Sequence, residues 1–175
     1  AVASRTETMI ASHFHQSREL LYAAEGAVAL TIRELDAIAD WDTVLSGAAS
    51  STFTDGASIG VRTLPGGITV VLCCGPGSLS ADVQSRAHAG MSWGADTPQW
   101  QIFAWGPVQN WLPPGRLNSA AYVVAWVADD PGDADGDPLA DSNNRVDVHA
   151  QALGVAGGRR VVQATVERPS GAGSP

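Results

Sequence analysis

Hydrophobic and polar positions divide the chain into one long helical segment and a series of shorter, strand-like segments. Residues 5–40 contain no proline and a single glycine, Gly26. Apolar or small residues recur here in alternating steps of four and three, which is the spacing of one face of a continuous α-helix. These positions are Ile10, Phe14, Ser17, Leu21, Ala24, Val28, Thr31, Leu35 and Ile38. The spacing predicts a helix of about 36 residues, roughly 54 Å long.

The two halves of this helix differ in the size of their apolar side chains. The first dozen residues carry few large apolar groups, whereas the second half has a broad apolar stripe of the kind that packs on a sheet. We expect Leu20 to Ile38 to be buried against strands and Ala1 to Phe14 to be more exposed. The helix is expected to end near Asp40, with Gly47 as the stop of its last turn.

The remainder of the chain predicts short strands joined by turns. The expected strands span residues 58–63, 68–74, 99–105, 120–128, 145–152 and 161–167, with a hairpin turn at Gly157-Gly158. Residues 68–74 are apolar on both faces and therefore indicate a central strand. Ser80 is expected to cap a short helix that runs to about Ala89 and closes at Gly90.

These elements predict an α+β fold in which a long N-terminal helix packs on an antiparallel sheet. Residues 1–168 form a single domain, with the helix at 1–42 and a β-rich head at 55–168. Residues 169–175 have the composition of a disordered tail.

The charge balance argues against nucleic-acid binding. Asp and Glu number 18 against 10 basic residues, all of them arginine, and the net charge is -8. A phosphate-binding surface needs clustered cations, which this composition does not favour.

The two cysteines, Cys73 and Cys74, are adjacent in the sequence. Ordinary disulfides join cysteines on facing backbone segments, so we expect two free thiols with at least one of them buried. A strained disulfide between neighbours is the alternative, and the pair does not settle the redox compartment.

An acidic insert at residues 129–144 is the sharpest local feature. Its aspartates are spaced by twos around Gly136, and the candidate metal ligands are Asp130, Asp133, Asp135, Asp137 and Asp141. A bending loop with many carboxylate oxygens suits Ca2+. The insert does not fit the EF-hand register, because Pro131 takes the first position and no Glu closes the loop. The alternative is a solvated loop whose Asp and Asn side chains cap their own turns.

Aromatic and histidine side chains give no sign of catalysis. Trp100, Trp105 and Trp126 lie in apolar strands and are expected in the core, which leaves Trp93 and Trp111 as the plausible exposed pair. The four histidines are expected at the surface: His13, His15, His88 and His149. No nucleophile motif or phosphate-binding glycine loop is present, so we expect no enzyme activity.

The start of the chain is abrupt. It has no initiator Met, no signal peptide and no stretch of about 20 apolar residues, and it begins just ahead of a helix already in register. We expect a cut or processed product whose helix continued upstream.

Several stretches, taken in their order along the chain, resemble the minor pilins of type IV pili, specifically the PilX-like group. Residues 18–27 (RELLYAAEGA) are similar to the family's YAAEAG segment, with Gly26 one position early. The other stretches are residues 40–47 (DWDTVLSG), 99–106 (QWQIFAWG), 122–130 (YVVAWVADD) and 135–138 (DGDP), followed by the closing hairpin. The family's peptidase site and the apolar first half of its helix are absent from this chain.

The resemblance implies a lollipop-shaped, non-enzymatic subunit that primes pilus assembly or lies at the pilus tip. Its partners would be other minor and major pilins, and its place would be the cell surface, or the inner membrane before assembly. Membrane contact would come only through the missing N-terminal segment. Contacts to other subunits are expected from the exposed part of the helix, at Met9, Ile10, Phe14 and Leu21.

Two other functions remain open from the sequence. One is a secreted, calcium-stabilised module for adhesion or carbohydrate binding that uses Trp93 and Trp111. The other is a minor pseudopilin of type II secretion, which shares the architecture but belongs to a different machine.

Overall fold

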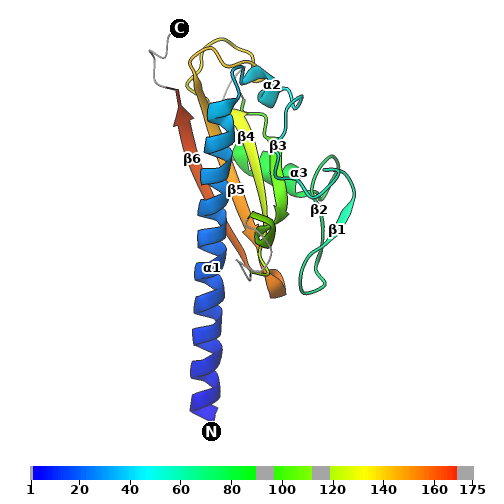
Figure 1. Cartoon of the computed structure of the whole chain (residues 1–175), viewed down its shortest axis with the longest axis vertical. Coiled ribbons are helices and arrows are strands. Elements are labelled where there is room, and N and C mark those ends of the chain that lie inside the picture. The colour runs from blue at the N-terminus through cyan, green and yellow to red at the C-terminus, as the bar shows by residue number, and fades with distance from the viewer. Residues whose placement is uncertain (1, 90–96, 112–118, 169–175) are drawn as a thin grey trace.

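The computed structural model describes residues 2–89, 97–111 and 119–168, and it has an α+β, pilin-like arrangement. A long helix, α1 (Val2–Ala37), packs against a four-stranded antiparallel sheet (Figure 1). The sheet is a simple meander of β3 (Gln101–Pro107), β4 (Tyr122–Asp129), β5 (Arg145–Leu153) and β6 (Arg159–Glu167). The predicted fold class is therefore confirmed.

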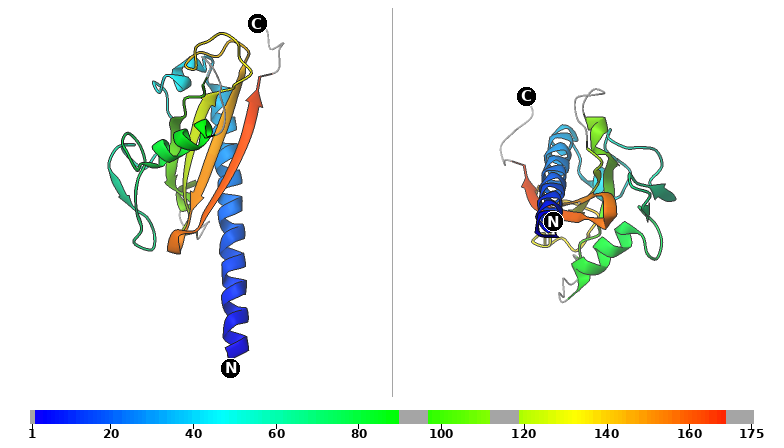
Figure 2. Two further views of the ribbon diagram at one scale, coloured as in Figure 1. Left: turned by 180° about the vertical axis from the view of Figure 1, so that it is seen from behind. Right: turned by 90° about the horizontal axis from the view of Figure 1, so that it is seen from below.

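The two faces of the sheet are covered by different helices. Alternate side chains along a strand point to opposite faces. Ala125 of β4 and Ala150 of β5 belong to the core under α1, whereas Trp126 and Leu153 belong to a second core on the opposite face. A shorter helix, α3 (Leu79–His88), covers that second face (Figure 2).

Small residues let α1 lie close to the sheet. Ala23, Ala24 and Ala27 are buried at this contact. At Gly26, an added Cβ would lie 2.5 Å from the ring of Trp111, so any other residue there would displace this ring. Trp111 ends a short 3-10 helix, η2 (Val108–Trp111), which follows β3.

The N-terminal part of α1 projects beyond the sheet (Figures 1 and 2). Residues 6–15 are exposed, and the continuous burial of the sheet-facing side begins at Leu20. The expected division of the helix into an exposed and a buried part is confirmed for these residues. No helix in the described part of the chain is long and apolar enough to cross a membrane.

The C-terminal end of α1 differs from the expectation of a helix that runs to Asp40. The helix stops at Ala37, and a separate single turn, α2 (Asp42–Leu45), precedes Gly47. Arg168, just after β6, donates hydrogen bonds to the carbonyls of Ile38 and Ala39. Its guanidinium also lies 4.1 Å from the centre of the Trp41 ring. Arg168 thus satisfies the carbonyls of the two residues that directly follow the helix.

The segment expected to be a central strand lies outside the main sheet. β1 (Val61–Thr63) and β2 (Thr69–Val71) form a separate two-stranded ribbon beside it (Figure 1). Of the residues in and around β2, Leu72 is fully buried, and it packs on the core beneath α3. The apolar side chains of this segment therefore pack on the second core, beneath α3, and do not form a central strand of the main sheet.

The start of α3 also differs from expectation. Its N-cap is Ser78, whose hydroxyl accepts a hydrogen bond from the backbone N–H of Ala81. Ser80 lies inside the first turn, where its hydroxyl donates to the carbonyl of Leu72 and accepts from the indole N–H of Trp126. Gly90, expected to close this helix, lies outside the described residues.

Candidate functional site

The connection between β4 and β5 brings three aspartates together. Asp129 is the last residue of β4, and Asp133 and Asp135 follow it in the loop. One carboxylate oxygen from each of them lies within 4.8 Å of the others, so the three could hold a metal ion. Three carboxylates that converge in this way suit a hard divalent cation, since Ca2+ takes about six to eight oxygen ligands.

Asp129 is the residue that distinguishes this cluster from an ordinary acidic loop. The residue is only 2% exposed, and neither carboxylate oxygen has a hydrogen-bond partner of good geometry among the described residues, although the adjacent backbone N–H of Asp130 partly offsets the effects that raise its pKa. Burial, followed by repulsion from Asp133, raises the pKa of Asp129 to about 7. An unpaired buried carboxylate is costly in free energy, and a bound cation would remove that cost.

Asp133 is held in place by one neighbour. The backbone N–H and the hydroxyl of Ser142 donate to its two carboxylate oxygens, at 2.7 and 2.6 Å. Burial by itself disfavours the charge on Asp133, but these hydrogen bonds prevail and lower the pKa of the carboxyl. The carboxylate of Asp133 is therefore kept ionised and oriented, as a ligand needs to be.

The other predicted ligands serve mainly to shape the loop. Asp130 accepts from Gly132 and from the side chain of Asn143, and Asp137 accepts from the backbone of Leu139. Asp141 accepts from the backbone N–H of Arg145. Of the five predicted ligands, Asp133 and Asp135 belong to the three-residue cluster, while Asp130, Asp137 and Asp141 do not.

Asp129 lies in the acidic insert predicted from the sequence but is not among the five predicted ligands, and in the structure it is the last residue of β4. The signal that could have identified it is its position directly after the run from Tyr122 to Ala128. A carboxylate there is carried by a strand that is buried on both faces. The loop is also fixed at its other side, where the backbone N–H of Asp141 donates to Asp42 in α2 at 2.8 Å.

The second candidate functional surface is the projecting part of α1. Met9, Ile10 and Phe14 are 57%, 64% and 59% exposed, and Leu21 is also partly exposed. Successive residues of a helix point about 100° apart, so Ile10, Phe14 and Leu21 form one stripe. Met9 lies on the side that, further along the helix, faces the sheet at Leu20. Met9 on one side of α1, and Ile10 and Phe14 on another, are therefore apolar groups on its projecting part, whereas Leu21 lies level with the head.

Of the two tryptophans expected to be exposed, only Trp111 lies in the described part of the chain. Trp111 is half-buried, with its ring against Gly26 and edge-on to Phe53 at 5.8 Å. Trp93 lies outside the described residues. Trp105 and Trp126 are buried as expected, and Trp100 is partly buried against the same core.

The expectation of a surface histidine is wrong for His149. It is 6% exposed, and its ring meets Trp100 and Trp126 edge-on at 5.5 and 5.7 Å. Its two ring nitrogens lie 2.9 Å from the side-chain amide of Gln151 and 2.8 Å from that of Gln163. Burial lowers the pKa of His149 to about 4, so the ring is neutral at pH 7. His13 and His15 are exposed as expected, and the side chain of His88 is not described.

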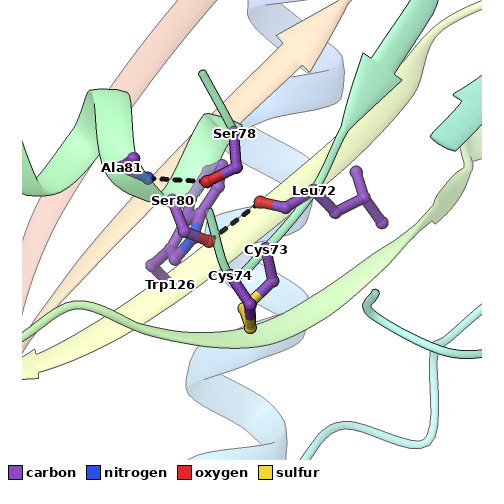
Figure 3. Close-up of a disulfide and its surroundings, with 7 residues drawn as sticks. All are labelled: Leu72, Cys73, Cys74, Ser78, Ser80, Ala81 and Trp126. Atoms are coloured by element: carbon purple, nitrogen blue, oxygen red, sulfur yellow. Dashed lines mark hydrogen bonds between the residues drawn. A yellow bond between two sulfur atoms is a disulfide. The ribbon is translucent and has the colours of Figure 1, made fainter. Parts of the chain in front are cut away.

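The two cysteines form a disulfide, so the expectation of free thiols is wrong. Cys73 and Cys74 are joined between β2 and α3, and Cys74 has a positive φ of 72° (Figure 3). The preceding residue, Leu72, accepts hydrogen bonds from both the backbone and the hydroxyl of Ser80. The disulfide thus fixes the turn that leads from the small ribbon into α3.

Comparison of the chain with protein-family models, with curated proteins and with solved structures finds no match.

Proposed function

We propose that this chain is a non-enzymatic minor pilin, a subunit that primes the assembly of a type IV pilus or lies at its tip. The observation that carries the proposal is the set of exposed apolar side chains on α1: Met9, Ile10 and Phe14 on its projecting part, and Leu21 next to the head (Figure 1). Large apolar side chains gathered on an unpaired helix favour burial in a partner. The partners are other minor and major pilins, whose helices supply matching apolar faces.

The pilus is favoured over the related type II secretion filament by the sequence resemblance. The architecture suits both assemblies, because a helix that projects from a compact head can pack among other helices while the head stays outside the bundle. The small residues of α1 at its contact with the sheet, such as Ala24 and Ala27, let the helix pack closely on the head. This close packing sets the direction in which the N-terminal part of α1 projects.

The test places charge on the exposed stripe. Ile10→Asp with Phe14→Asp, introduced at the native locus, is expected to remove most of the protein from sheared filaments without lowering its total amount in the cell. The matched control, Ala11→Asp with His15→Asp, has the same spacing on exposed positions turned by about 100°. The amount of this control variant in sheared filaments should be closer to that of the unaltered protein than to that of the Ile10→Asp, Phe14→Asp variant.

Two results would contradict this proposal. Equal incorporation of both variants and the unaltered chain would show that the stripe is not an interface. Purification with secretion pseudopilins and not with pilins would assign the subunit to the other filament.

We further propose that the Asp129, Asp133 and Asp135 cluster binds Ca2+ and so fixes the loop between β4 and β5. The support is the buried carboxylate of Asp129, which has no hydrogen-bond partner of good geometry among the described residues, together with the two converging aspartates. Calorimetric titration with Ca2+ is expected to show binding of one ion per chain.

We infer an extracytoplasmic location for the head. Disulfides persist mainly in oxidising compartments, and the pairing of Cys73 with Cys74 supports such a place. Cell fractionation with an antibody against the head tests this inference, and recovery of the protein in the cytoplasm alone would overturn it.

A further inference from the structure

A groove lies on the outer face of the sheet, between α3 and strands β5 and β6, away from the projecting part of α1. Its volume is about 510 Å³, and a smaller hollow of about 230 Å³ shares three of its lining residues. These shared residues are Trp100, Asp147 and Gln163. Ligand sites commonly have volumes of about 300 to 1,000 Å³, so the groove has the size of a small-molecule site.

The wall that carries Trp100 is fixed by α3. The side-chain amide of Gln84 donates to the carbonyl of Pro98 at 2.7 Å and accepts from the backbone N–H of Trp100 at 2.9 Å. The Trp100 ring then packs edge-on against His149. A partly buried aromatic ring is thereby held in one position on the groove wall.

The polar groups of the groove are held by neighbours that leave them spare hydrogen-bonding capacity. Asp147 accepts from the hydroxyl of Thr165 through one carboxylate oxygen, at 2.7 Å. Gln163 is oriented by its contact with the buried ring of His149, and His149 is fixed in turn by Gln151. A carboxylate and a primary amide can each make several more hydrogen bonds beyond these.

The charges around the groove balance. Arg86 and Arg159 line it, and both pair with Asp82, at 2.9 and 2.8 Å. With Asp147, these groups give two positive and two negative charges. A strongly charged ligand therefore gains no net attraction, whereas a neutral ligand rich in hydroxyl groups meets both donors and acceptors.

We propose that this groove binds a neutral sugar. One apolar face of the sugar would lie against Trp100. Its hydroxyl groups would donate to Asp147, accept from Arg86, and both donate to and accept from Gln163. Apolar lining with a few oriented polar groups is the usual composition of such sites. The site is separate from the pilin interface proposed on α1, so its test does not depend on filament assembly.

The experiment is titration of the isotope-labelled protein with a panel of neutral sugars, followed by amide and side-chain NMR. The panel comprises glucose, galactose, mannose and N-acetylglucosamine, with their β-linked disaccharides, and glucuronate serves as a charged comparator. At least one neutral sugar is expected to shift the indole N–H of Trp100 and the side-chain amide of Gln163. Asp147→Asn and Gln163→Ala are each expected to weaken its binding about tenfold, as the loss of a hydrogen bond does.

The matched control is Glu167→Gln, on the same strand and face but outside the groove lining. It should bind like the unaltered protein, and the same spectra report whether each variant is folded. The proposal fails if no sugar shifts these signals, if only glucuronate does, or if both groove variants bind as tightly as the control.

Discussion

At the scale of single residues, Asp129 is the side chain in the head whose environment most strongly favours a bound cation. It is a buried carboxylate at the end of a strand that is covered on both faces, and it has no hydrogen-bond partner of good geometry among the described residues. Because its pKa is raised to about 7, the carboxyl is about half protonated at neutral pH, and its ionised form carries a desolvation cost of several kcal/mol. A cation bound to the carboxylate would remove most of this cost in folding stability.

Asp129→Asn should therefore have opposite effects without and with Ca2+. Without Ca2+ it removes the unpaired charge and is expected to raise the melting temperature. With Ca2+ it removes a ligand, so the stabilisation by Ca2+ and the heat of binding should both be lost. Differential scanning calorimetry with and without chelator measures the first effect, and titration calorimetry measures the second.

Asp137→Asn is the matched control for this change. Asp137 lies in the same loop, but it is exposed and outside the three-residue cluster. It should keep most of the response to Ca2+. If the unaltered protein shows neither heat nor a change in melting temperature with Ca2+, the metal proposal is wrong.

At the scale of elements, the disulfide links the small ribbon to the helix that covers the second core. Cys74 adopts a positive φ, a backbone conformation that residues other than glycine rarely adopt. The bond holds this turn while Leu72 receives two hydrogen bonds from Ser80. Ser80 in turn accepts from Trp126 of β4, so the turn, α3 and the sheet are connected through three neighbouring groups (Figure 3).

Replacement of both cysteines by serine should loosen this region and leave the main sheet intact. A disulfide between adjacent residues closes almost no chain, so it constrains the unfolded state little, and the loss in global stability should be small. The expected result is faster amide hydrogen exchange at residues 72–82, with protection of β4 and β5 unchanged.

Chemical reduction of the unaltered protein is expected to reproduce this exchange pattern and to have no effect on the serine variant. Faster exchange throughout the sheet would contradict the assignment of a local role to the disulfide. Unchanged exchange at residues 72–82 would show that the hydrogen bonds of Ser80 are sufficient to hold α3 without it.

At the scale of the whole molecule, the sequence predicted the architecture well because its main elements have strong periodic patterns. The long helix and the strands β5 and β6 follow from the spacing of apolar residues. The division of the helix follows from the size of its apolar side chains, and β4 follows from its continuous apolar run. The sequence pattern did not indicate which helix covers each face of the main sheet. The polar side of β5, where His149 lies, is covered by α3 and Trp100 from distant parts of the chain.

The candidate metal site was predicted only in part for a similar reason. Alternating aspartates identified the loop, but the convergence of Asp129 with Asp133 and Asp135 depends on how the loop folds back at the end of β4. The ribbon was misplaced because an apolar run such as residues 68–74 fits either a central strand or a cover over a second core.

The shape of the molecule predicts that the projecting part of α1 contributes little to the free energy of unfolding of the head. Residues 6–15 are exposed, whereas Gln16 donates to the carbonyl of Val155 at 2.8 Å and Leu20 packs against Gly154. Deletion of residues 1–14 should therefore shift the melting temperature by no more than about 2 °C. Leu20→Ala, at the first buried position of α1, should lower the free energy of unfolding by about 2 to 4 kcal/mol and clearly lower the melting temperature. If the deletion destabilised the head as much as Leu20→Ala does, the segment would serve the fold of its own chain, and its apolar stripe would not be free for a neighbouring subunit.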